Sequence, residues 1–110
     1  MDNEINQLSE FQEAILNDAG LITYFYNDHC APCKSLRPKV LEMVDQDFPK
    51  MKIVFINSEK HPEISASYGI FSNPTLLVYF DGKEYVRKSK YVSIPELKTA
   101  IERLYGMMFS

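Results

Sequence analysis

The chain has no tryptophan and only two cysteines among its 110 residues. Cys30 and Cys33 stand too close together in the sequence for a disulfide between them to cross-link a fold. This excludes a disulfide-stabilised scaffold, and the lack of a second pair excludes a four-cysteine zinc site within one chain. A chain of this length buries about two-thirds of its unfolded surface, so we expect one domain over residues 1–110 without cross-links. The cysteine pair is therefore either chemically active or coincidental.

Long apolar runs and an excess of positive charge are missing as well. The longest apolar run, Thr75 to Phe80, has the length of a strand, whereas a membrane span needs about 20 residues. The formal net charge of −3 offers no basic surface for nucleic acid. The first residues are acidic and polar, unlike a secretory signal, although a mature chain that had lost its signal would look the same. We expect a cytoplasmic protein with no membrane or nucleic-acid partner.

Hydrophobic patterning predicts one α/β domain. Continuous β-branched and aromatic runs indicate strands covered on both faces, whereas apolar residues at helical spacing indicate helices. The predicted elements are a helix from a capping box at Ser9 to about Gly20, a strand over 21–26, a helix over 31–47 bent at Pro38, a strand over 52–56, a helix over 61–68, strands over 74–80 and 84–88, and a helix after Ser93. The crossover rule makes the first two strands parallel neighbours. We expect a central mixed sheet with helices on both faces.

The motif that carries chemistry is Cys30-Ala31-Pro32-Cys33, just after a predicted strand and at the first turn of a predicted helix. Free backbone N–H groups and the helix dipole favour negative charge there, so the Cys30 thiol should ionise more easily than a free cysteine. Cys33, one helical turn later, is placed to attack a mixed disulfide formed by Cys30. Pro32 has no N–H and suits an early helical position, and Lys34 adds a nearby positive charge.

Two other interpretations of the pair remain open at this point. A Cys-x-x-Cys spacing also arises by chance, without any role. Half of a zinc site, completed by a second copy of the chain, would use the same two residues. The position at a strand-to-helix junction favours redox chemistry over both.

Further motifs are spread along the chain beside the cysteine pair. They are Pro38 within a helix, Tyr68-Gly69-Ile70, Asn73-Pro74-Thr75 and Phe80-Asp81-Gly82-Lys83. With Cys30-Ala31-Pro32-Cys33-Lys34 they make the sequence resemble the thioredoxin family from about Ile5 to Tyr105. The resemblance implies the thioredoxin fold, Cys30 as nucleophile, Cys33 as resolving thiol and a cis peptide bond before Pro74. It also implies that an extended client segment contacts the residues around these motifs: Asn73, Thr75, His29, Ala31 and Pro32.

Three departures from the family pattern concern the surroundings of the cysteines. His29 stands where tryptophan is usual; when protonated it would stabilise a thiolate, and an exposed ring without that role is the alternative. Ala31 replaces the usual glycine and restricts the backbone. Typical thioredoxins bury an acid where this chain has Tyr24 and its lysine companion where it has Phe55, so both charges are missing together. We therefore expect deprotonation of Cys33 to rely on water or the Tyr24 hydroxyl, with Tyr24 as plain core the alternative.

A fourth departure lies near the last helix. The glycine that many thioredoxins carry there is replaced around Tyr91-Val92, on a surface that binds partners in the family. We expect altered recognition by the usual reductase. Tyr26, Phe71 and Tyr91 are candidate residues for the rim of the site, with ordinary packing as the alternative.

The sequence thus predicts a dithiol–disulfide oxidoreductase that reduces protein disulfides. No metal and no organic cofactor is expected, because the Cys30–Cys33 pair is itself the redox group. The expected partners are disulfide-containing client proteins and a reductase or another thiol electron donor, and we expect a monomer. One alternative is a binding module of the same fold without turnover. Another is a glutaredoxin-like enzyme that uses glutathione, although the chain lacks a Cys-Pro-Tyr-Cys motif.

Overall fold

Helices and strands follow one another in the order predicted from the sequence. The structure, a computed structural model, describes residues 3–109; Met1, Asp2 and Ser110, which the predicted domain includes, lie outside the described residues. The elements are α1 (Leu8–Asn17), β1 (Gly20–Tyr26), α2 (Ala31–Asp47), β2 (Lys52–Asn57), α3 (Pro62–Ser67), β3 (Thr75–Phe80), β4 (Lys83–Ser89) and α4 (Ile94–Phe109). Within residues 3–109 no helix is long and apolar enough to cross a membrane.

The four strands form one mixed sheet in the order β2-β1-β3-β4. β1 lies parallel to β2 and antiparallel to β3, and β3 lies antiparallel to β4. The parallel pair is joined through α2, as the crossover rule predicted. β4 is an edge strand, and the register between β3 and β4 shifts between Val78 and Tyr79.

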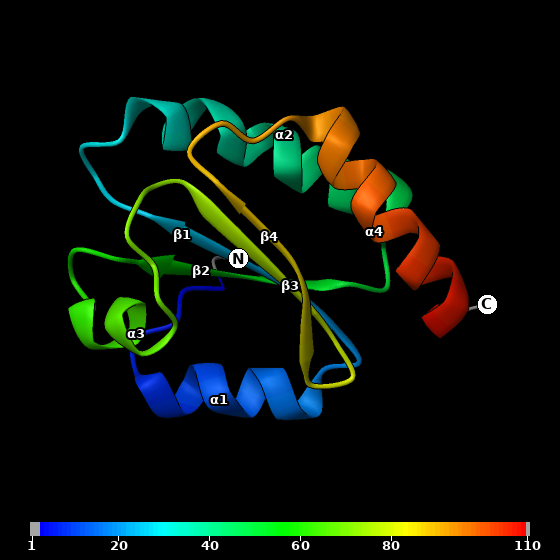
Figure 1. The fold of residues 1–110 in the computed structure, drawn as a ribbon, viewed down its shortest axis with the longest axis horizontal. Coiled ribbons are helices and arrows are strands. Elements are labelled where there is room, and N and C mark those ends of the chain that lie inside the picture. Colours follow the sequence, from blue (N-terminus) through cyan, green and yellow to red (C-terminus); the bar gives the residue numbers. More distant parts are fainter. Residues whose placement is uncertain (1–2, 110) are drawn as a thin grey trace.

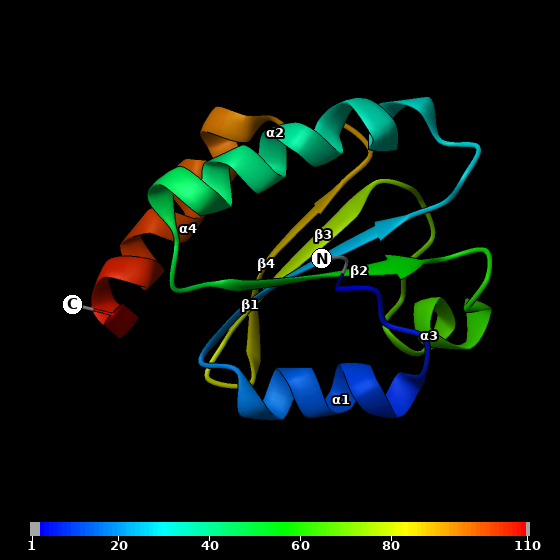
Figure 2. The same cartoon turned by 180° about the vertical axis from the view of Figure 1, so that it is seen from behind.

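Helices cover both faces of the sheet, so the core has two layers. α2 and α4 lie on one face, and α1 and α3 lie on the other (Figures 1 and 2). Alternate residues of the central strand β1 serve the two layers: Ile22 and Tyr24 belong to the α2/α4 layer, and Leu21 and Phe25 to the α1/α3 layer. The expectation of buried strands is therefore confirmed for β1 and, from Ile53 onward, for β2, and β3 is buried as well. The helices and loops at the ends of these strands are therefore attached to a buried centre.

Helix α2 has the predicted bounds, and α1 does not. α2 runs from Ala31 to Asp47 with Pro38 inside it. The predicted start of α1 at a Ser9 capping box is wrong: the helix begins at Leu8, after Gln7, whose side chain makes no capping bond. Instead the carboxylate of Glu10 accepts a hydrogen bond from the backbone N–H of Asn6 at 2.9 Å. The capping bond at the start of α4 is present, since the Ser93 hydroxyl accepts from the Glu96 N–H at 3.4 Å.

The end of α3 depends on a glycine in the left-handed conformation. Gly69 has φ +67°, and its N–H donates to the carbonyl of Ala66 at 3.3 Å. The N–H of Ile70 donates to the carbonyl of Ser65 at 2.9 Å, which completes a Schellman motif. This ends the helix just before the loop that leads to Pro74.

Beside β2 lies a short pairing that the sequence did not reveal. Glu4 forms an isolated parallel bridge to Phe55, with hydrogen bonds from the Ile5 N–H to the Phe55 carbonyl and from the Phe55 N–H to the Asn3 carbonyl. The lengths of these bonds are 2.8 and 2.9 Å. The pairing brings the Glu4 side chain to the α2 side of the sheet.

Candidate active site

Cys30 and Cys33 form a disulfide at the start of α2. Cys30 follows the loop after β1, and Cys33 lies in the first turn of the helix, with the two Cα atoms 5.2 Å apart. The two residues differ in exposure: Cys30 is partly exposed, whereas Cys33 is only 2% exposed. An incoming sulfur atom therefore reaches Cys30 and not Cys33.

The start of α2 provides hydrogen-bond donors for a negative charge on Cys30. Cys30 is the N-cap residue, and its Sγ accepts a hydrogen bond from the Cys33 N–H at 3.2 Å. Pro32 lies in the first turn, where its missing N–H leaves no unpaired donor. A helix N-terminus stabilises a thiolate both through these N–H groups and through the helix dipole. The predicted placement of the pair is therefore confirmed.

A groove beside the disulfide brings Pro32 and Pro74 to the same surface. Its volume is about 340 Å³, and its lining also includes Leu36, Tyr91 and Val92. The peptide bond between Asn73 and Pro74 is cis, as the resemblance implied. The groove is thus formed by the first turn of α2, the start of β3 and the loop after β4.

The two residues that flank Pro74 differ in accessibility. Asn73 is partly exposed, and its Oδ1 accepts a hydrogen bond from the Ser58 hydroxyl at 2.8 Å. Thr75 is 1% exposed, and its hydroxyl donates to the carbonyl of Ser72 at 2.7 Å. Its side chain therefore holds the loop together from inside, while Asn73 stays within reach of a bound segment.

Lys90 lies on this groove, and sequence reasoning did not single it out. It has φ +63°, a left-handed conformation that is uncommon outside glycine, and its N–H donates to the Pro74 carbonyl at 2.8 Å. The bond holds the loop after β4 against the cis-proline loop. The sequence pattern came close to indicating Lys90, because the glycine usual in the family is replaced around Tyr91-Val92, one or two residues later. Tyr91 itself is 94% exposed at the groove, and Phe71 is 92% exposed.

The remaining motif residues lie on the surface around the disulfide. Ala31, Pro32 and Lys34 are exposed. The imidazole of His29 is 79% exposed, and its Nε2 lies 3.6 Å from the carboxylate of Glu59, where the two form an ion pair when the ring is protonated. The exposure of His29 and Ala31 leaves both available to a bound partner.

Tyr24 lies directly beneath the first turn of α2. Its side chain is fully buried, and its hydroxyl donates a hydrogen bond to the carbonyl of Cys33 at 2.6 Å. Burial raises the pKa of Tyr24 to about 12, and the positive charge of Arg37 counteracts part of this effect. Near neutral pH the hydroxyl keeps its proton and is already bonded, so its geometry suits anchoring Cys33 better than accepting the thiol proton. The Tyr24 ring packs against Phe55 at a centroid distance of 5.5 Å, in place of the family's charged pair.

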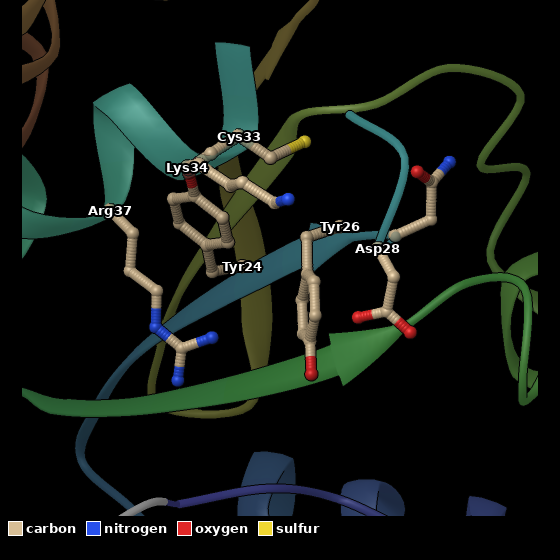
Figure 3. A pocket seen from close by; sticks show the side chains of 7 residues that line it. Tyr24, Tyr26, Asp28, Cys33, Lys34 and Arg37 are labelled. Carbon is tan, nitrogen blue, oxygen red and sulfur yellow. The ribbon is translucent and has the colours of Figure 1, made fainter. Parts of the chain in front are cut away.

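A cavity next to Cys33 collects charged and polar groups that the motifs did not reveal. Its volume is about 190 Å³, and Figure 3 shows its lining: Tyr24, Tyr26, Asn27, Asp28, Cys33, Lys34 and Arg37. The guanidinium of Arg37 lies 3.8 Å from the centre of the Phe55 ring. It also forms an ion pair of 3.3 Å with Glu4. No pattern in the sequence links Glu4 to Arg37, because their contact arises only through the bridge beside β2.

Within residues 3–109, no group of three or more histidine, cysteine or acidic side chains is arranged to hold a metal ion. The geometry instead provides an accessible sulfur, a buried sulfur bonded to it, and a groove beside both. Such an arrangement carries out thiol–disulfide exchange.

Comparison with known proteins agrees with the site. The Thioredoxin family model matches residues 3–103. A thioredoxin from Porphyra purpurea is 33% identical over 81 residues, which cover 74% of this chain and 76% of that protein. Among solved structures, thioredoxin 1 from Thermosipho africanus is 28% identical, with a TM-score of 0.73 over 82% of this chain and 99% of its own.

The likeness in fold extends to more distant proteins. The oxidised form of mitochondrial thioredoxin 3 from Saccharomyces cerevisiae is 23% identical and superposes with a TM-score of 0.80, covering 96% of this chain and 94% of its own. The predicted thioredoxin fold is therefore confirmed. The chain belongs to the thioredoxin family and is a thiol–disulfide oxidoreductase whose redox group is the Cys30–Cys33 pair.

Proposed function

We propose that this protein reduces disulfides of client proteins in the cytoplasm and is then reduced by a reductase or another thiol donor. The difference in exposure between Cys30 and Cys33 carries the proposal, because it makes one sulfur the point of contact and the other the internal resolving group. Two cysteines that are not used to cross-link the fold suit a reducing compartment such as the cytoplasm. No metal or organic cofactor takes part.

In the first step the Cys30 thiolate attacks one sulfur of the client disulfide. A Cys30–client disulfide forms, the client S–S bond breaks, and the second client sulfur leaves as a thiolate that takes a proton from water. The Cys33 N–H group, which donates to Cys30 Sγ at 3.2 Å, and the helix dipole both stabilise the attacking thiolate. The groove along Pro74 holds the client segment, with Asn73, His29, Ala31 and Pro32 around it.

In the second step Cys33 loses its proton and attacks Sγ of Cys30. The Cys30–Cys33 bond forms, the mixed disulfide breaks, and the client leaves with two thiols. The client has gained two electrons and the protein has lost two, so a reductase or another thiol donor must return two electrons to the protein before the next cycle. We expect a reduction potential in the reducing half of the range from roughly −270 to −120 mV spanned by such folds.

Trapping of the mixed disulfide tests this order of events. Cys33→Ser should accumulate a covalent complex with a disulfide-containing client such as insulin, released by dithiothreitol, whereas Cys30→Ser should form none. The unaltered protein should reduce insulin catalytically with dithiothreitol as donor. Absence of turnover would favour the binding-module alternative, and a potential near −120 mV would overturn the reducing direction.

Supplying different electron donors separates the proposal from the glutaredoxin-like alternative. Turnover with a thioredoxin reductase and not with glutathione supports the proposal. Turnover with glutathione alone would contradict it.

A further inference from the structure

We propose that the ion pair between Glu4 and Arg37 controls how readily Cys33 gives up its proton. The inference rests on the proposed role of Cys33 as the resolving thiol. Arg37 and Glu4 are positioning residues in this scheme, since they act on Cys33 through the field across the cavity.

Arg37 is placed to act on Cys33 by the geometry of α2. It follows Cys33 by four residues, so the two side chains leave the same face of the helix, and both line the 190 Å³ cavity. Figure 3 shows the Arg37 side chain descending from α2 beside Tyr24 toward β2. There its guanidinium stacks at 3.8 Å on Phe55 and lies 5.3 Å from the centre of the Tyr26 ring. These contacts hold a positive charge under the first turns of the helix.

Glu4 fixes and offsets that charge. One carboxylate oxygen lies 3.3 Å from Arg37 Nη2, and the other accepts a hydrogen bond from the Tyr26 hydroxyl at 2.8 Å. The side chains of Arg37 and Glu4 are 28% and 29% exposed, so water screens the pair only in part. The positive charge favours the Cys33 thiolate, and the negative charge opposes it.

The other groups around Cys33 are uncharged, exposed to water or paired, so the Glu4–Arg37 pair has the largest expected effect on the pKa of Cys33. From β1, Tyr24 and Tyr26 keep their protons because burial raises the pKa of both hydroxyls. From the loop and α2, Asp28 and Lys34 are exposed and carry opposite charges at the cavity rim. The β3 residues in the same core layer, Leu76, Val78 and Phe80, are uncharged. His29 and Glu59 pair with each other on the surface.

Arg37 already acts across this space on a neighbour of Cys33. Its positive charge lowers the pKa of Tyr24 against the larger effect of burial, and the Tyr24 hydroxyl lies 2.6 Å from the Cys33 carbonyl. A nearby unit charge in a partly screened site shifts a pKa by roughly 0.5 to 1 unit. Removing Arg37 and removing Glu4 should therefore move the pKa of Cys33 by such an amount in opposite directions.

The test is a titration of the reduced full chain, with isotope-labelled cysteine Cβ atoms followed by NMR. Arg37→Met keeps the stacking stem and removes the positive charge, so the pKa of Cys33 should rise. Glu4→Gln keeps an acceptor for Tyr26 and removes the negative charge, so the pKa of Cys33 should fall. Arg37→Lys keeps a positive charge and should restore most of the original value.

The pair Lys98–Asp47 provides a matched control. Asp47 ends α2, and its carboxylate lies 3.6 Å from Lys98 Nζ, with the Lys98 and Asp47 side chains 46% and 34% exposed. Lys98→Met and Asp47→Asn should leave the pKa of Cys33 unchanged, because both charges lie at the far end of the helix. Urea unfolding of each variant identifies any that fails to fold.

Shifts of the same sign in Arg37→Met and Glu4→Gln, or no shift in either, would overturn the inference. Its failure is distinguishable from failure of the proposed function, since the titration needs no client and no turnover. Failure of Cys33→Ser to trap a client would remove the function and leave the titration result standing. If both hold, the pH profile of client release from Cys30 should shift with the pKa of Cys33 in the same two variants.

Discussion

Tyr24 ties the first turn of α2 to the sheet through a single buried hydrogen bond. Its hydroxyl donates to the Cys33 carbonyl at 2.6 Å, and its ring packs on Phe55. A buried acid at the same position would need a partner charge, whereas a tyrosine needs only this acceptor. The side chain thus serves both as core and as a fixed support for the resolving cysteine.

Replacing Tyr24 by Phe should weaken the fold while preserving its packing. The change removes the bond to the Cys33 carbonyl, and a buried neutral hydrogen bond contributes about 1 kcal/mol. We expect the free energy of unfolding of the oxidised protein to fall by about that amount, measured by urea denaturation.

Tyr79→Phe is the control for this change. Tyr79 is 4% exposed, and the described part of the chain offers its hydroxyl no hydrogen bond. Its loss should therefore cost clearly less than the loss of the Tyr24 hydroxyl. Equal effects of the two changes would show that the bond to Cys33 adds nothing to stability.

At the residue scale, the sequence predicted the redox pair and missed the charges beside it. Cys30 and Cys33 are identifiable because spacing and local position define their chemistry. The contact of Glu4 with Arg37 is not, because it joins residues 33 positions apart and depends on a backbone bridge to Phe55. The flanking residues Asn73 and Thr75 were both predicted to contact a client segment. Thr75 is buried, however, so only part of the motif Asn73-Pro74-Thr75 is accessible to a client.

Among the elements, α3 shows how a short helix is held at its end. Gly69 closes the Schellman motif, and the guanidinium of Arg87 on β4 donates to the carbonyls of Tyr68 and Gly69 at 3.0 and 3.3 Å. Arg87 is itself oriented by a two-pronged ion pair with Glu84, with bonds of 2.8 and 2.9 Å. The edge strand therefore supports the loop that leads to Pro74.

Gly69→Ala should destabilise the protein by about 1 kcal/mol. The cause is backbone strain at φ +67°. A steric clash is not the cause, because an added Cβ would meet its nearest neighbours at an ordinary 3.9 Å. Gly106→Ala is the control: it lies within α4 with no atom within 4 Å of an added Cβ, so alanine should stabilise the helix by up to about 1 kcal/mol. Thermal or urea unfolding measures both. A stabilising effect at Gly69 would contradict the role of its conformation.

The elements that the sequence predicted well are those with strong local signals. The Asp81-Gly82 turn is found between β3 and β4, with φ values of +53° and +78° at its two residues. Gly69 likewise ends α3. The predicted start of α1 was wrong because Ser9 and Gln12 match the capping-box spacing by chance. The bond that is formed, from the Asn6 N–H to the Glu10 carboxylate, does not have the spacing of a capping box, so the sequence pattern did not reveal it.

For the whole molecule, buried tyrosines link stability to pH in the alkaline range. Burial raises the pKa of Tyr24 from 10.0 to about 12 and raises the pKa of Tyr79 as well. The folded protein therefore holds protons that the unfolded chain releases above pH 10. This contribution to stability is complete below pH 10 and is lost as the pH rises toward 12.

We expect the urea midpoint to fall steeply with pH above about 10 and to do so less steeply in Tyr24→Phe. Unfolding curves at pH 8, 9, 10 and about 11 measure the effect, with tyrosine absorbance reporting ionisation. The same slope in Tyr24→Phe and the unaltered chain would contradict a raised pKa at that residue.

The arrangement of the whole chain was predictable to the level of a mixed sheet with helices on both faces. The parallel pairing of β1 and β2 follows from the crossover rule, and β3 and β4 follow from the turn at Asp81-Gly82. The central position of β1 beside β3 came only through the family resemblance, because local patterning does not state which strands are neighbours.

The edge strand β4 has a consequence for how the molecule behaves among unfolded chains. Of its residues only Val86 is buried, the strand carries Lys83, Glu84, Arg87 and Lys88, and its register with β3 is interrupted near Tyr85. Charges and a bulge on an open edge discourage a foreign strand from extending the sheet. This edge of the sheet is in this way protected from co-aggregation with unfolded chains that the protein encounters.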